Sequence, residues 1–271
     1  MSDVLHPIGI FDSGIGGLTV AQAISHLLPN EQLIYFGDTA HMPYGEKSAE
    51  AIQYYSLKIA DFLIQKQCKL IVIACSTASA VANEILVNRI DNQIPIINVI
   101  DPVVEAVLQS GISSVGILAT QRTTKSNVYP QKLRHKNDTI KVAAKATGSL
   151  ASIIEEGMYK SPETMSAIMN YYLSDLQFSK LEGIILGCTH YPLIKQFISN
   201  FYSHQIRIFD ATDTVAQEVN NRLVGLNLKC HIERDIKHHF YVSDYTQTFE
   251  DASQIFFGKH IYLNHYPIWE L

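Results

Sequence analysis

The sequence lacks any run of about 18 uninterrupted apolar residues, so no segment is expected to span a bilayer. Its N-terminus has no basic region followed by an apolar stretch and a small-residue cleavage site, which predicts a cytoplasmic location. Lysine and arginine are scattered and the net charge is −5, so nucleic acid is not expected as a partner. With 47% hydrophobic and 17% charged residues, the 271-residue chain has the composition of a folded globular protein.

Cysteine is also scarce. Cys68, Cys75, Cys188 and Cys230 do not form the pattern of a disulfide framework, and no pair has the short spacing of a zinc site or of a redox C-x-x-C motif. The glycine-rich residues 12–17 match neither common phosphate-binding pattern well. No lysine lies in a setting that suggests pyridoxal phosphate. We therefore expect free thiols, no metal and no cofactor.

Short apolar runs alternate with longer amphipathic stretches, which is typical of βα units with mainly parallel sheets and helices on both faces. Strands are predicted at residues 8–11, 33–36, 70–74, 96–99, 115–119, 140–144, 183–187, 207–209 and 239–243. Helices are predicted, from apolar spacings of three and four, at residues 18–28, 49–66, 77–88, 103–109, 124–133, 163–175, 193–200, 214–223 and 249–257.

The chain also resembles itself. Residues 8–13 (IGIFDS) resemble residues 115–120 (VGILAT), and residues 71–77 (IVIACST) resemble residues 184–190 (IILGCTH). We expect two pseudo-symmetric α/β lobes, a discontinuous first lobe of residues 1–98 and 212–271 and a second lobe of residues 99–211. Ligands of open α/β sheets bind beyond the carboxyl ends of the strands, where all four matched segments end. Facing lobes would therefore direct Cys75 and Cys188 into one cleft.

Both cysteines follow a predicted strand and precede a predicted helix. The N–H groups of a first helical turn favour an anion and lower the pKa of a thiol, so we expect thiolate to be available at Cys75 and Cys188. Inverting a carbon stereocentre requires taking a proton from one face and returning one to the other, which two acid/base groups across a cleft can do. Asp12 beside one thiol and His190 beside the other are expected to assist.

Five motifs follow one another along nearly the whole chain: residues 11–18 (FDSGIGGL), 37–40 (GDTA), 43–45 (PYG), 74–79 (ACSTAS) and 187–190 (GCTH). In this order they resemble the glutamate racemases of the cofactor-independent aspartate/glutamate racemase superfamily. The resemblance implies two α/β lobes with the active site between them, commonly in a homodimer. It implies cytoplasmic interconversion of L- and D-glutamate for peptidoglycan synthesis, with Cys75 exchanging the proton of D-glutamate and Cys188 that of L-glutamate.

The resemblance also assigns supporting catalytic roles to Asp12, His190 and Glu155, although Glu156 adjoins Glu155. Glutamate carries two carboxylates and an ammonium group, so its site needs many neutral donors. The residues expected to bind substrate are Asp12, Ser13, Ser76, Thr77, Thr120, Thr124 and Thr189, with the backbone N–H groups of Tyr44 and Gly45. Ser76 stands where glutamate racemases usually carry asparagine, so a racemase of aspartate or another acidic amino acid stays open as an alternative. A non-catalytic amino-acid-binding protein with the same two-lobed cleft is the other alternative.

Overall fold

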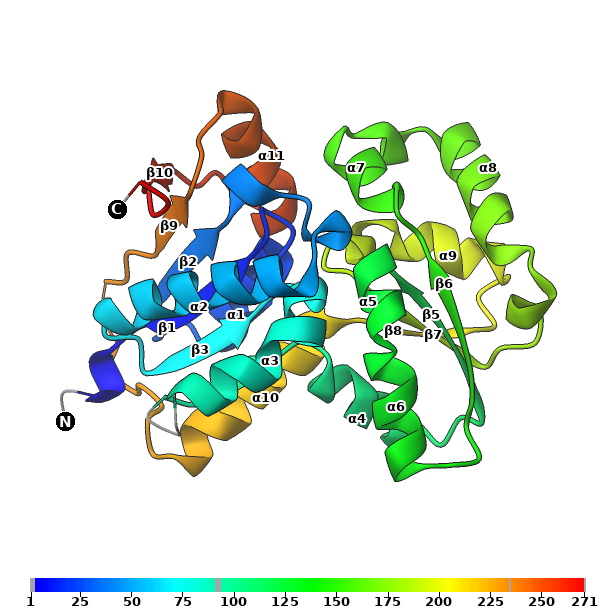
Figure 1. The fold of residues 1–271 in the computed structure, drawn as a ribbon, viewed down its shortest axis with the longest axis horizontal. Helices are drawn as coiled ribbons and strands as arrows, with labels where there is room; N and C mark the ends of the chain where they lie inside the picture. Colours follow the sequence, from blue (N-terminus) through cyan, green and yellow to red (C-terminus); the bar gives the residue numbers. More distant parts are fainter. Residues whose placement is uncertain (1–2, 91–93, 234, 271) are drawn as a thin grey trace.

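The computed structural model describes residues 3–90, 94–233 and 235–270, so residues 1–2, 91–93, 234 and 271 of the expected first lobe lie outside the described residues. Two sheets organise the chain, one of six strands in the order β10-β9-β2-β1-β3-β4 and one of four in the order β6-β5-β7-β8. Every strand pair in both sheets is parallel. Figure 1 shows the two sheets side by side with helices around each, which confirms the predicted fold class.

The six-stranded sheet has helices on both faces. Its strands are β1 (Ile8–Asp12), β2 (Leu33–Gly37), β3 (Leu70–Ile73), β4 (Ile96–Asn98), β9 (His239–Val242) and β10 (Leu263–His265). Alternate side chains of a strand point to opposite faces. Phe11 packs among buried residues of α2 (Ala49–Gln65) and α3 (Ser76–Ile90). Ile8 and Ile10 pack in the cluster that includes α1 (Leu18–Leu27), α10 (Ala211–Gly225) and α11 (Gln247–Phe257).

The four-stranded sheet forms the other half of the molecule. Its strands are β5 (Ser114–Ala119), β6 (Lys141–Ala146), β7 (Gly183–Gly187) and β8 (Arg207–Phe209). The helices around it are α4 (Asp101–Gln109), α5 (Gln121–Ser126), α6 (Val128–Lys136), α7 (Leu150–Glu155), α8 (Pro162–Leu173) and α9 (Lys195–Phe201). Short 3-10 helices are η1 (Asp3–Leu5), η2 (Thr39–His41), η3 (Tyr44–Glu46), η4 (Met158–Lys160), η5 (Leu176–Phe178) and η6 (Tyr191–Ile194).

The strand order explains the internal resemblance of the sequence. The order β2-β1-β3-β4 in the first sheet is repeated as β6-β5-β7-β8 in the second. The matched segments are β1 with β5 and β3 with β7, which are neighbours at the centre of each order. The chain passes to the second sheet after β4 and returns to the first after β8. Cys75 and Cys188 therefore follow corresponding strands in the two sheets.

One local prediction differs from the structure, and two elements of the structure were not predicted. The single helix predicted at residues 124–133 is two helices, α5 and α6, because Asn127 between them adopts a left-handed conformation with φ 57°. Asparagine tolerates this conformation better than most residues, and it ends the helical hydrogen bonding there. Helix α7 and strand β10 were not predicted, since α7 has only six residues and β10 (LNH) contains a single apolar residue.

Candidate active site

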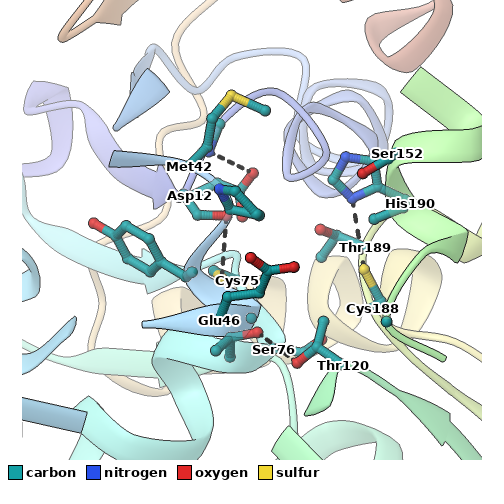
Figure 2. A pocket seen from close by; sticks show the side chains of 18 of the residues that line it. Asp12, Met42, Glu46, Cys75, Ser76, Thr120, Ser152, Cys188, Thr189 and His190 are labelled. Carbon is teal, nitrogen blue, oxygen red and sulfur yellow. Dashed lines mark hydrogen bonds between the residues drawn. The ribbon is translucent and has the colours of Figure 1, made fainter. Parts of the chain in front are cut away.

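A cavity of about 90 Å³ lies between the carboxyl ends of the two sheets. Figure 2 shows Cys75 and Cys188 on opposite sides of it. The predicted site residues that line the cavity are Asp12, Ser13, Tyr44, Gly45, Cys75, Ser76, Thr77, Thr120, Glu155, Cys188, Thr189 and His190. Thr124 is not part of the lining; it lies one turn beyond Thr120, which caps the start of α5. The two halves of the repeat therefore contribute jointly to one site.

Cys75 lies in a buried setting that keeps its proton on sulfur. Its Sγ donates to Ser13 Oγ (3.6 Å) and accepts the N–H of Ala78 (3.4 Å) in the first turn of α3. Burial and the nearby Asp12 carboxylate raise the pKa of the Cys75 thiol to about 12, and these hydrogen bonds offset only part of that rise. The expectation of a lowered pKa at Cys75 is therefore wrong, because desolvation and a like charge outweigh the helix terminus.

Cys188 has a different partner. Its Sγ lies 3.5 Å from Nδ1 of His190, and Nε2 of His190 lies 2.6 Å from Oε1 of Glu155. Burial works against the imidazolium, but Cys188 and Glu155 together hold the pKa of His190 well above its usual range. Thiol, imidazole and carboxylate thus form one hydrogen-bonded chain, drawn in part in Figure 2. His190 therefore places a positive charge next to the Cys188 sulfur.

Asp12 interacts electrostatically with both Cys75 and His190. It is buried, and its Oδ2 accepts the N–H groups of Gly14 (3.2 Å) and Gly17 (3.0 Å). Burial raises the pKa of Asp12, opposed by the charge of His190 and by these backbone donors. The loop that follows Asp12 lies so close to the second lobe that a Cβ on Gly16 would fall 2.3 Å from Cε1 of His190. Glycine at that position therefore permits the approach of the two halves.

Hydroxyl groups connect the two sheets across the cavity. Thr77 Oγ1 and Thr120 Oγ1 are 3.0 Å apart, which joins the start of α3 to the start of α5. Thr19 Oγ1 donates to the backbone oxygen of Thr189 at 3.2 Å. A Cβ on Gly45 would lie 3.0 Å from Cβ of Thr120, so the segment carrying Gly45 also packs directly against the second half. Neutral donors are therefore numerous around the two thiols.

Residues 17–219 match the model of the Asp/Glu/Hydantoin racemase family. The chain belongs to this family. It is 39% identical to the glutamate racemase of Geobacter metallireducens over 93% of this chain and 92% of that protein. The crystal structure of glutamate racemase from Francisella tularensis in complex with D-glutamate superposes with a TM-score of 0.92 at 35% identity, covering 99% of this chain and all of the other (100%). The Thermus thermophilus glutamate racemase in complex with β-chloro-D-alanine gives a TM-score of 0.88 at 34% identity, covering 99% and 100%.

The racemase cavity also contains residues that sequence reasoning did not select. These are Gly14, Met42, Pro43, Glu46, Gln121, Gly148, Ala151 and Ser152. Gly14 and Pro43 lie within quoted motifs, so the motifs could have indicated them. Ala151 and Ser152 belong to α7, which was not predicted.

Within residues 3–90, 94–233 and 235–270, no group of three or more His, Cys, Asp or Glu side chains is arranged to hold a metal ion. No helix in the same ranges has the length and hydrophobicity needed to cross a membrane.

Proposed function

We propose that this racemase interconverts L- and D-glutamate by moving the α-proton between Cys75 and Cys188. The observation that carries the proposal is the placement of the two thiols. They follow corresponding strands of two sheets that repeat one strand order, and they line one cavity from opposite sides. Each thiol also has its own acid/base neighbour, Asp12 for Cys75 and His190 for Cys188.

The two thiols have different neighbours, and we assign the first proton transfer from these neighbours. Cys188, beside the His190 imidazolium, acts as the base that removes the α-proton of L-glutamate. Cys75 retains its proton near neutral pH, since its pKa is about 12, and delivers that proton to the opposite face of the α-carbon. D-glutamate is formed, Cys188 carries the proton it removed, and the electron pair of the broken C–H bond forms the new one. The neutral donors around the cavity stabilise the carbanionic transition state.

The reverse reaction runs through the same groups. Cys75 must then be the thiolate, and we propose that its proton passes to Asp12, whose charge acts on Cys75 and whose own pKa is raised by burial. In achiral water the two enantiomers have equal free energies, so kcat/KM must be the same in both directions for the wild type and for every variant. Differences between the two thiols can therefore appear only in kcat and KM taken separately.

The proposal extends to the setting of the reaction. We propose residues 1–98 with 212–271 and residues 99–211 as the two lobes, a homodimer as the assembly, and the cytoplasm as the location. The reaction needs no cofactor in this scheme, and its D-glutamate serves peptidoglycan synthesis. The substrate carboxylates are bound by Ser13, Ser76, Thr77, Thr120 and Thr189 hydroxyls and by the N–H groups of Tyr44 and Gly45.

The test is a comparison of initial rates by circular dichroism on L-glutamate, L-aspartate and a panel of other amino acids, without added cofactor. Racemisation fastest on glutamate is expected. Faster reaction of L-aspartate would leave the thiol roles intact and overturn the substrate, and binding without reaction would favour an amino-acid-binding protein. Cys75→Ser and Cys188→Ser should each nearly abolish turnover while the fold is retained. Wild-type turnover in either variant would remove the two-thiol mechanism.

A further inference from the structure

Asp38 is a fully buried carboxylate outside the cavity that the proposed reaction does not use. It follows β2, and its backbone N–H donates to the backbone oxygen of Asp12 at 3.0 Å. Burying an ionised carboxylate is costly unless hydrogen bonds compensate it. The Asp38 carboxylate has several such hydrogen bonds, and the segments that supply them are far apart in sequence.

Four side chains converge on this carboxylate. Tyr44 Oη donates to Oδ2 at 2.7 Å, and Ser243 Oγ donates to Oδ1 at 2.7 Å. Nε1 of Trp269 donates to Oδ1 at 2.8 Å, and Nδ1 of His41 lies 3.0 Å from Oδ2. The network therefore joins the segment after β2 to the end of β9 and to the residues that follow β10.

The part of this network that faces the cavity is Tyr44. Its side chain is 1% exposed, and burial together with the Asp38 charge holds the pKa of Tyr44 well above its usual range, so its hydroxyl keeps the proton that it donates. The same residue lines the cavity, with Met42 and Pro43 before it and Gly45 after it. A displacement of the Tyr44 ring would therefore move the backbone that borders the substrate.

The C-terminal segment fixes the network from the other side. The ring of Trp269 contacts His41 edge to face, with centroids 4.6 Å apart, and Tyr55 at 5.2 Å. Ser243 Oγ also accepts the N–H of Ala40 at 3.0 Å, which ties η2 to the end of β9. Residues 38–46 are therefore held in place by Trp269, Tyr55 and Ser243, which do not line the cavity.

We infer that Asp38 is a positioning residue, and that Trp269 and Ser243 act through it to hold residues 42–46 in the conformation that binds substrate. The inference rests on the proposed function for its kinetic consequence. In the proposed function the backbone N–H groups of Tyr44 and Gly45 bind the substrate and take no part in the proton transfers. Loosening the segment therefore weakens binding of both enantiomers and leaves the proton transfers, carried by Cys75 and Cys188, almost unchanged.

The test uses Trp269→Phe, which removes the Nε1 donor and keeps an aromatic ring, with Asp38→Asn as the stronger variant. Tyr54→Phe is the matched control, because its exposed ring lies against Trp269 at 6.1 Å and it makes none of the hydrogen bonds to Asp38 described above. In Trp269→Phe we expect KM for L- and D-glutamate to rise about tenfold, because one hydrogen bond to a charged group is lost. We expect kcat to stay within about twofold of the wild type.

A role in stability alone gives a different kinetic result. It would reduce the fraction of folded enzyme, and so lower kcat while KM stays constant; that outcome, or no change in either constant, overturns the inference. Should Asp38→Asn fail to fold, Trp269→Phe decides the question alone.

Amide hydrogen exchange supplies a readout that does not depend on activity. Exchange in residues 39–47 should accelerate in Trp269→Phe, while exchange in α8 stays at the wild-type rate. If the wild type fails to racemise glutamate, the proposed function falls and this exchange comparison still decides the positioning role. Unchanged exchange in residues 39–47 contradicts it.

Discussion

Replacing Glu155 with glutamine tests the chain of groups behind Cys188. Oε1 of Glu155 lies 2.6 Å from Nε2 of His190, with side chains 24% and 9% exposed. A hydrogen bond between charged groups contributes about 1.5–3 kcal/mol, and the partial exposure of Glu155 places this one at the lower end because solvent screens it. A loss of about 1.5 kcal/mol corresponds to about a tenfold fall in kcat/KM.

The fall should depend on pH in a defined way. The pKa of His190 is held high in part by Glu155, so the neutral amide lowers it. The imidazolium that contacts Cys188 is present below this pKa and is lost as pH rises through it. The alkaline limb of the kcat/KM profile should therefore move to lower pH in Glu155→Gln, equally for both enantiomers.

The measurement is the pH profile of initial rates by circular dichroism for the wild type and the variant. Glu156→Gln is the matched control, because Glu156 is the next residue along the chain, is exposed and does not line the cavity. It should leave the profile in place. An alkaline limb that does not move in Glu155→Gln, or that moves as far in Glu156→Gln, refutes the assigned role of Glu155.

Two other pairs of variants give further predictions. Cys75→Ala should exchange the α-proton of L-glutamate with solvent deuterium without inverting it, and Cys188→Ala should do the same for D-glutamate; proton NMR showing exchange of the opposite enantiomer would reverse the two roles. Glu31 and Lys69 form an ion pair at 2.6 Å with side chains 1% and 2% exposed, so Glu31→Gln leaves a buried cation unpaired and should lower the free energy of unfolding by about 3 kcal/mol in urea titrations. Glu105→Gln, which breaks an exposed pair, should give no measurable change; equal effects would show that burial is not the cause.

The sequence predicts the sheets well because their strands are apolar runs bounded by polar residues. The predicted bounds of β7 and β8 are those of the structure. The helix predicted at residues 124–133 was not predicted correctly, because its apolar pattern continues across Asn127 and the interruption depends on the backbone conformation of that one residue. Periodicity reports which face of a segment is apolar and does not report such a break.

Residues of the candidate site were predictable where they follow strands of the repeated unit, as Cys75 and Cys188 do. Other features depend on contacts between distant segments. Trp269 donates to Asp38 across 231 positions of sequence, which no local pattern indicates. The raised pKa of Cys75 likewise depends on how completely the folded chain removes water from its sulfur, whereas the sequence indicates only the helix that follows it.

The most direct test of the two-thiol account is the reaction of L-glutamate with the pure protein in D₂O, followed from its first few per cent by proton NMR with separation of the enantiomers. Cys188 removes a proton from one face while Cys75 delivers solvent-derived deuterium to the other. The account therefore predicts that the first D-glutamate formed carries deuterium at the α-carbon and that the remaining L-glutamate still carries protium. Deuterium appearing in L-glutamate as fast as in D-glutamate would contradict it, because a single base would then serve both faces.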